Sequence, residues 1–329
     1  MNLEQLYLVI VLSVACFVIT YLSIALSITL LKKGGFLVED FHKKDKRLVP
    51  RPAGPAIFVG VALPLLSLFF STLEIRYLAV LSSVSIIFLI GLIDDFRVLS
   101  GKLKMTLTAL GSLPLLAFGV YDPHPVFPIF GPTRLTLVYP LIVLATIPVV
   151  ANAVNMIDVY NGTVSGAAVL LALSQIFPLI LYGRLGDAIL PLLLLSASLA
   201  FYLFNRYPSK IFAGDSGSLM LGALFGASAI VTRTEIPSLV AFVPAILNGF
   251  YILASIRGII EHRSIRARPV YLNEEGLLVS SKDRAAPITL ARLIVADGPL
   301  PERKAALRMS LLFAYSMLLA ILTSLLIKG

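Results

Sequence analysis

Four aspartates lie at the ends of apolar segments, where they could share one cation. Asp94 and Asp95 close one segment in GLIDDF, Asp158 lies in NAVNMIDVYNG, and Asp215 opens another segment in FAGDSGS. Carboxylates at the ends of membrane helices are costly to desolvate, so they need a compensating positive charge. Each also has a simpler interpretation, since Asp94 and Asp95 could be a solvated pair and Asp215 an N-cap. Their predicted position on one face of the protein favours a common site.

Basic residues accompany these carboxylates. Two lysines lie at the start of the apolar segment that follows Asp95, and a further group lies in the last long loop: Lys102, Lys104, His262, Arg263, Arg266 and Arg268. Mg²⁺ prefers hard oxygen ligands, usually one or two protein carboxylates together with phosphate oxygens. Lys and Arg can balance the remaining phosphate charge. The residue types therefore fit a site for Mg²⁺ and a diphosphate, although the loop group could instead bind anionic lipid headgroups or serve membrane topology alone.

Other kinds of site have little support in the sequence. The chain has three histidines and one cysteine, Cys16, without the spacing of a zinc site and without a disulfide partner. It has neither a P-loop nor a GxGxxG motif, so a soluble nucleotide-binding fold is not indicated. The net charge of +9 arises from a few loops, and we predict no nucleic-acid partner.

Long apolar blocks must position these residues. Of the 329 residues, 58% are hydrophobic and 14% charged, and the mean hydropathy is +0.94, well beyond the values of a soluble domain. The excess falls into blocks of roughly 17–25 residues, the length of a membrane-spanning helix. We expect an all-α, polytopic membrane bundle of about ten helices, folded as a single domain over residues 1–329. The expected spans are 4–31, 53–73, 75–93, 104–120, 135–151, 163–182, 187–204, 216–232, 237–258 and 305–327.

The distribution of Lys and Arg predicts the orientation of this bundle. Segments after odd-numbered spans hold 22 of the 27 basic residues, and the other segments hold five. Cytoplasmic loops are enriched in Lys and Arg, so the odd loops are expected in the cytoplasm and both termini outside. The acidic residues described above then lie at the cytoplasmic face of an integral, multi-pass membrane protein.

The longest connection, residues 259–304, has a mixed composition. It contains an expected β-hairpin around NEEGLLVSS at 273–281 and an apolar stretch, ITLARLIVA, at 288–296. We interpret this loop as a cytoplasmic excursion with a hairpin and an amphipathic interfacial helix before the last span.

Five motifs, in order along nearly the whole chain, resemble the polyprenyl-phosphate N-acetylhexosamine-1-phosphate transferase superfamily. They are RLVPRPAG at 47–54, GLIDDF to KLK at 91–104, NAVNMIDVYNG at 152–162, FAGDSGS at 212–218 and HRSIR at 262–266. Asn161–Gly162 and the stretch 288–312 resemble the dolichyl-phosphate GlcNAc-1-phosphotransferase branch. Asp158 resembles the bacterial motif, and this mixture is similar to archaeal members. The chain lacks the consecutive histidines of the phospho-MurNAc-pentapeptide translocases, which argues against that substrate.

The resemblance implies roles for individual residues. Asn155 and Asp215 would hold Mg²⁺, for which Mn²⁺ could substitute, and Lys104 would contact the diphosphate. Asp94 and Asp95 match the paired aspartates of the family, as a general base or in positioning the acceptor. The remaining substrate contacts would be Asp158, Asn161 at the edge of the base, Phe212 stacked on uracil, and His262, Arg263 and Arg266 on the sugar and phosphates.

The implied reaction transfers GlcNAc-1-phosphate, or a related HexNAc-1-phosphate, from a UDP-sugar to dolichyl or polyprenyl phosphate and releases UMP. It would be the first membrane step of lipid-linked oligosaccharide assembly for N-glycosylation. A sibling transferase with another UDP-HexNAc or with undecaprenyl phosphate as acceptor is one alternative. A secondary transporter is another, since intramembrane carboxylates also mark ion pathways, but no inverted repeat is evident. Membrane lipids are expected partners, and a homodimer would be consistent with the family.

Overall fold

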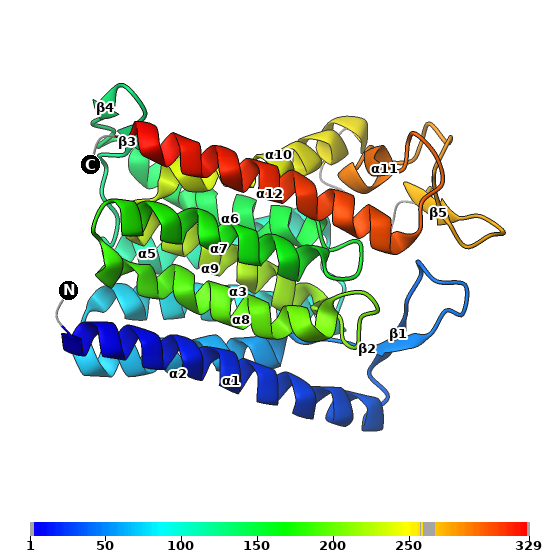
Figure 1. Ribbon diagram of the computed structural model, residues 1–329, viewed down its shortest axis with the longest axis horizontal. Coiled ribbons are helices and arrows are strands. Elements are labelled where there is room, and N and C mark those ends of the chain that lie inside the picture. Colours follow the sequence, from blue (N-terminus) through cyan, green and yellow to red (C-terminus); the bar gives the residue numbers. More distant parts are fainter. Residues whose placement is uncertain (1–2, 257, 259–266, 328–329) are drawn as a thin grey trace.

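Long parallel and antiparallel helices form one bundle in the computed structural model, which describes residues 3–256, 258 and 267–327 (Figure 1). Within those ranges, nine helices are long and apolar enough to cross a membrane. They are α1 (Leu3–Lys33), α2 (Gly54–Thr72), α3 (Ile75–Phe96), α6 (Tyr139–Met156), α7 (Thr163–Leu181), α8 (Ile189–Asn205) taken together with the short helix η2 before it, α9 (Gly214–Val231), α10 (Glu235–Ile256) and α12 (Glu302–Leu326). The expected polytopic helical fold is confirmed.

Shorter elements occupy the two ends of the bundle. The helical ones are α4 (Gly101–Thr108), η1 (Ala109–Ser112), α5 (Leu113–Ala117), η2 (Leu185–Ala188) and α11 (Leu290–Ile294). Three antiparallel two-stranded hairpins pair β1 (Leu37–Glu39) with β2 (Leu48–Pro50), β3 (Val126–Phe127) with β4 (Gly131–Pro132), and β5 (Val270–Leu272) with β6 (Leu278–Ser280). The hairpin expected at 273–281 is therefore present, with its strands on either side of the turn.

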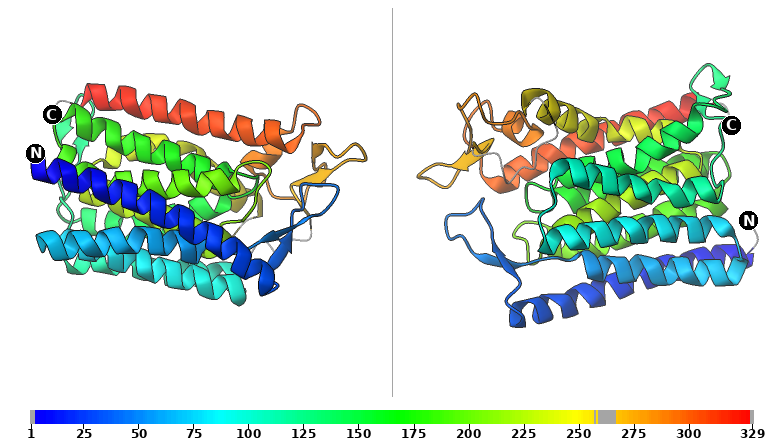
Figure 2. Two further views of the ribbon diagram at one scale, coloured as in Figure 1. Left: turned by 60° about the horizontal axis from the view of Figure 1, so that its bottom comes forward. Right: turned by 180° about the vertical axis from the view of Figure 1, so that it is seen from behind.

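The two ends of the bundle differ in what they carry. Figures 1 and 2 place both chain termini and the β3–β4 hairpin at one end, and the β1–β2 hairpin, the β5–β6 hairpin and α11 at the other. At this second end α3 and α6 finish and α9 begins. We call it the site end, because all the described residues of the expected site belong to segments that meet there.

The expected fourth span, 104–120, is not one regular helix. It consists of α4, η1 and α5, which follow one another without a gap. Pro114 lacks the amide proton that a continuous helix would need. Gly111 lies so close to α3 and α6 that an added Cβ would lie 2.7 Å from Ile87 and 3.0 Å from Ile147. Local sequence and tight packing together account for the interruption.

Helix α9 is the centre of the bundle. Every residue from Gly214 to Ile230 is buried, and the helix packs mainly against α3 and α6. Its sequence is rich in Gly, Ala and Ser, which let neighbouring backbones approach closely in a membrane bundle. At Gly222, an added Cβ would lie 2.7 Å from the Cα of Ala151 on α6. This packing places the polar start of α9 between the ends of α3 and α6.

Candidate active site

Asp95, at the end of α3, caps the first turn of α9. Its Oδ1 accepts the backbone N–H of Asp215 at 2.8 Å, and its Oδ2 accepts the backbone N–H of Ser216 at 3.0 Å and the Ser216 hydroxyl at 2.5 Å. The first N–H groups of a helix have no partner inside it, and a carboxylate there also favours the helix dipole. Asp95 therefore fixes the start of α9, although it lies 120 residues away in sequence.

Two glycines allow this junction to form. An added Cβ on Gly91 would lie 2.6 Å from the Cα of Ser216, so α3 can approach α9 only without a side chain there. Gly214 has φ of +72°, a conformation that other residues adopt with strain. The glycines of GLIDDF and FAGDSGS thus bring the acidic ends of α3 and α9 together.

Asp215 lies between Asn155 and Lys104. Its Oδ1 accepts the side-chain amide of Asn155 at 2.6 Å and lies 3.8 Å from the ammonium of Lys104. The same amide of Asn155 donates to the hydroxyl of Ser218 at 2.8 Å. An amide, a carboxylate and an ammonium from α6, α9 and α4 thus meet at one point.

The adjacent residues Asp94 and Asp95 perform different tasks. Consecutive helical side chains point in different directions, and the Asp94 carboxyl lies beside the carboxyl of Asp215 rather than at the first backbone N–H groups of α9. Its Oδ2 forms an ion pair with Lys104 at 2.5 Å, and its Oδ1 accepts the backbone N–H of Leu99 at 2.6 Å. Asp94 is buried and holds Lys104 beside Asp215.

Arg51 is a site residue that the sequence reasoning did not single out. Its guanidinium donates to Asp95 at 3.0 Å and to Asp215 at 3.1 Å. It belongs to RLVPRPAG, so the ordered motif was the signal that could have identified it. The motif reaches α9 through its main chain as well, because the N–H groups of Ala53 and Gly54 both donate to the carbonyl of Ala213.

The charges of this cluster do not balance. Among the residues that the structure describes, four carboxyl groups, those of Asp94, Asp95, Asp158 and Asp215, face two cations, Arg51 and Lys104, so that part of the cluster would carry a net charge of −2 with all four ionised. Burial raises the pKa of Asp158 to about 7; Arg51 opposes this shift, and the nearby carboxylates of Asp215 and Asp95 add to it. A bound divalent cation would offset the excess.

The donor set suits Mg²⁺. Asn155 and Asp215 supply hard oxygens at the centre of the cluster, with the hydroxyl of Ser218 beside them. The amide of Asn155 presents its nitrogen to Asp215 here and would present its oxygen to a cation, since the two ends of an amide have nearly the same shape. The residues that the sequence predicted as metal ligands therefore fit a divalent ion.

Asn161 and Phe212 lie in segments that adjoin the cluster. Among the contacts of the described residues, neither side chain touches a carboxylate of the cluster. Asn161 is buried, and its side-chain amide donates to Asp40 at 3.2 Å. The N–H of Phe212 donates to the carbonyl of Pro50, and its carbonyl accepts the N–H of Ala53. His262, Arg263 and Arg266 lie outside the described residues.

A second group of potential metal ligands, Asp40, His42 and Glu302, lies at the site end. Its carboxylates already have cationic partners, because Lys43 contacts both and Arg47 lies 3.7 Å from Asp40. Burial lowers the pKa of His42 to about 4, with Asp40 opposing and Lys43 adding to the shift, so the imidazole is neutral. Two carboxylates and two cations leave no charge for a metal ion to balance.

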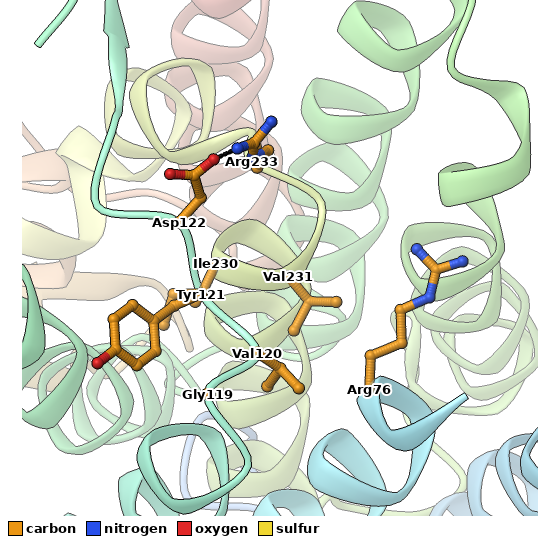
Figure 3. A pocket seen from close by; sticks show the side chains of 8 residues that line it. All are labelled: Arg76, Gly119, Val120, Tyr121, Asp122, Ile230, Val231 and Arg233. Carbon is orange, nitrogen blue, oxygen red and sulfur yellow. Dashed lines mark ion pairs between the residues drawn. The ribbon is translucent and has the colours of Figure 1, made fainter. Parts of the chain in front are cut away.

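A cavity of about 250 Å³ lies at the opposite end of the bundle (Figure 3). Val120, Tyr121 and Val231 line it, with Arg76 and Arg233 at its edges. Both arginines have carboxylate partners: Arg76 contacts Glu74 and Asp187, and Arg233 contacts Asp122. The amide, carboxylate and ammonium combination of the site end is not found among its lining residues.

Comparison with known proteins gives a consistent result. Residues 77–233 match the family described as glycosyl transferase family 4. The chain is similar to a Sulfolobus acidocaldarius protein provisionally named UDP-N-acetylglucosamine–dolichyl-phosphate N-acetylglucosaminephosphotransferase, with 30% identity over 223 residues, 65% of this chain and 68% of the relative. A Methanocaldococcus jannaschii protein, provisionally named glycosyltransferase, is 28% identical over 267 residues, 80% of this chain and 79% of the relative. A Bacillus subtilis protein, provisionally named undecaprenyl-phosphate N-acetylglucosaminyl 1-phosphate transferase, is 32% identical over 227 residues, 65% of this chain and 62% of the relative.

Proposed function

Because this chain belongs to glycosyl transferase family 4, we propose that it transfers N-acetylglucosamine-1-phosphate from UDP-GlcNAc to dolichyl or another polyprenyl phosphate and releases UMP. One observation carries the proposal: Asn155, Asp215 and Lys104 meet at the start of α9, within a cluster in which the described carboxyl groups outnumber the described cations. The names of the archaeal and bacterial relatives support this donor and this class of acceptor.

The proposed cofactor is Mg²⁺, held by Asn155 and Asp215. When bound, it would supply positive charge to the diphosphate and orient it. Lys104 would neutralise charge that develops on the departing phosphate, as electrostatic stabilisation requires. Asp94 supports this role, because its ion pair keeps the ammonium of Lys104 beside Asp215.

In the proposed reaction, an oxygen of the lipid phosphate attacks the β-phosphorus of UDP-GlcNAc in line with the bridging oxygen. The new bond joins the two phosphates of the lipid diphosphate, and the bond from the β-phosphorus to that oxygen breaks, so that UMP leaves with the electron pair. The nucleophile is already mostly ionised at neutral pH. The main tasks of the protein are therefore to align two anions and to balance their charge.

This chemistry requires no general base, which agrees with the geometry of Asp95. Its two oxygens are engaged by two backbone N–H groups, a hydroxyl and Arg51. We therefore assign Asp95 to positioning α9, and Asp94 to positioning Lys104.

The remaining substrate contacts are proposed from the sequence. Asp158 lies beside the cluster and would face the donor, while Asn161 would read the edge of the base and Phe212 would stack on it. His262, Arg263 and Arg266 would contact the sugar and its phosphates from the long loop between α10 and α12.

We place the site end at the cytoplasmic face, with both termini outside, because Lys and Arg are concentrated in the loops of the site end. The nucleotide-sugar would then arrive from water and the prenyl chain from the bilayer. This assignment corresponds to the first membrane step of lipid-linked oligosaccharide assembly for N-glycosylation.

A grid of donors and acceptors tests the proposal. Purified protein is incubated with UDP-GlcNAc, UDP-GalNAc or UDP-MurNAc-pentapeptide, each with dolichyl or undecaprenyl phosphate, and UMP is measured with and without Mg²⁺. UMP formation from UDP-GlcNAc and dolichyl phosphate is the expected result. Preference for another pair would identify a sibling transferase, and a transporter would release no UMP from any pair.

A further inference from the structure

A largely enclosed lysine, Lys43, links segments of the site end that are far apart in sequence. The ammonium of Lys43 lies 2.7 Å from Oδ2 of Asp40 and 2.9 Å from Oε2 of Glu302, the first residue of α12. The side chain of Lys43 is 12% exposed and those of its two partners 3%. Such burial makes these ion pairs part of the folded interior rather than surface contacts.

The same two carboxylates hold the loop between α6 and α7. Oε1 of Glu302 accepts the backbone N–H of Asn161 at 3.0 Å, and Oδ2 of Asp40 accepts its side-chain amide at 3.2 Å. Asn161 is thus held through both its main chain and its side chain. We call Asp40, Lys43, Asn161 and Glu302 the clasp.

The clasp also reaches the segment that leads into α9. Lys43 lies over the ring of Tyr207, 4.5 Å from its centroid, and the guanidinium of Arg47 donates to the carbonyl of Ser209 at 2.8 Å. The clasp therefore joins the β1–β2 hairpin, loop 157–162, the segment before α9 and the start of α12. Three of these continue directly into the candidate active site, at Arg51, Asp158 and Asp215.

The chemistry of the clasp is that of a structural link. Lys43 and Arg47 balance Asp40 and Glu302, whereas the active-site cluster has an excess of negative charge. Hydrogen bonds from Lys43 and Asn161 outweigh burial and lower the pKa of Asp40, so its carboxylate stays ionised. The family match at 77–233 does not include Asp40, Lys43 or Glu302, so it assigns them no role.

We propose that Lys43 and Glu302 are positioning residues that fix loop 157–162 and so determine how tightly the UDP-sugar donor binds. This proposal rests on the function proposed above. The clasp lies among the loops at the site end, which Figures 1 and 2 place beyond the ends of the helices. The water-soluble donor must enter on that side, whereas the prenyl phosphate enters from the bilayer. Loss of the clasp should therefore affect the donor more than the acceptor.

Two substitutions separate the parts of the clasp. Lys43→Met removes the ammonium but keeps most of the apolar stem, and Glu302→Gln removes the charge but leaves an oxygen that can accept the N–H of Asn161. Lys44→Met is the matched control, because Lys44 is the next residue along the chain and is exposed. The measurements are kcat, KM for UDP-GlcNAc and for dolichyl phosphate, the Kd of UDP-GlcNAc without acceptor, and the melting temperature.

We expect Lys43→Met to raise the donor KM and Kd by about tenfold or more, the change produced by losing one charged contact. The acceptor KM should stay within about twofold, a shift too small to reflect a lost contact. Glu302→Gln should have a smaller effect in the same direction, and the double variant less than the product of the two single effects, because both act through one link. Lys44→Met should resemble the wild type.

Equal losses in donor and acceptor KM together with a lower melting temperature would overturn the proposal, because they would indicate a general loss of fold. An unchanged donor Kd in both clasp variants would also overturn it. If the wild type binds UDP-GlcNAc but forms no UMP, the proposed function fails while the Kd measurement still tests the clasp. If the wild type does not bind UDP-GlcNAc, both proposals fail.

Discussion

Lys104→Met should lower turnover strongly. Lys104 is buried, and its ammonium lies 2.5 Å from Asp94 and 3.8 Å from Asp215. Methionine keeps most of the apolar stem, so the substitution removes mainly the charge. The ammonium that is lost would face the negative charge that develops on the diphosphate.

The size of the effect follows from the geometry. At the 3.8 Å that separates Lys104 from Asp215, two unit charges interact by about 4 kcal/mol at an effective dielectric constant of 20. Loss of one preorganised contact to a transition-state oxyanion costs about 2.7–4 kcal/mol, or a factor of roughly 100 to 1,000 in kcat. Since the ammonium would interact with a diphosphate at similar range, we expect kcat to fall at least ~100-fold.

The assay is UMP release by purified protein in detergent, at saturating UDP-GlcNAc and dolichyl phosphate. Lys102→Met is a matched control, because Lys102 lies on the same short helix, α4, but is exposed. It should retain turnover within about twofold of wild type, as surface substitutions usually do. Wild-type kcat in Lys104→Met, or an equal loss in Lys102→Met, would refute the assigned role.

Three further perturbations test separate parts of the site. Asp95→Ala leaves buried N–H groups at the start of α9 without a partner, which should cost about 1–3 kcal/mol of stability in a denaturation experiment; an unchanged midpoint would contradict the capping role. The folded-state pKa of Asp158, about 7, lies above the ordinary value of 3.8. The free energy of unfolding of the protein therefore falls as pH rises between these two values, because the unfolded state gives up this proton first. Without metal, the melting temperature of Asp158→Asn should therefore exceed that of the wild type at pH 8 and equal it near pH 4. A difference in melting temperature that is the same at both pH values would exclude this titration. Chelation with EDTA should abolish UMP release, with recovery on addition of Mg²⁺ or Mn²⁺; activity that persists in EDTA would argue against a metal-dependent reaction.

Much of the fold could be predicted because the membrane constrains it locally. Apolar runs of sufficient length predict the long helices, and their ends differ from the expected spans by a few residues. The β5–β6 hairpin was predicted from its turn residues. The interruption at η1 was missed, because it depends on the close approach of α3 and α6 to Gly111. The composition of the segment does not show which helices pack against it.

The sequence indicated several residues that lie together in the structure, but not their individual contacts. Asn155, Asp215 and Lys104 were expected to lie together, and the structure brings them within ion-pair or hydrogen-bond range. Asp94 and Asp95 have different roles because their side chains leave α3 in different directions and meet different neighbours. These neighbours follow from the packing of α3 against α9 and α4, which the sequence alone does not give.

Arg51 and the clasp were missed for the same reason. Lys43 and Arg51 lie in a basic loop whose charge the predicted membrane topology also accounts for, so residue type alone did not single them out, and Arg51 was marked only by the RLVPRPAG motif. Glu302 lies more than 250 residues from Lys43. Long-range ion pairs of this kind become visible only when the loops at the site end are placed in space.

In the proposed reaction, the lipid phosphate attacks the β-phosphorus of UDP-GlcNAc at the Asn155–Asp215 site. Transfer from UDP-GlcNAc labelled with radioactive phosphorus at the β position tests it most directly. We expect Mg²⁺-dependent appearance of the label in the dolichyl diphosphate product, unlabelled UMP in water, and loss of both in Asp215→Asn. Label that remains in soluble UDP or phosphate, or transfer that Asp215→Asn leaves unchanged, would contradict it.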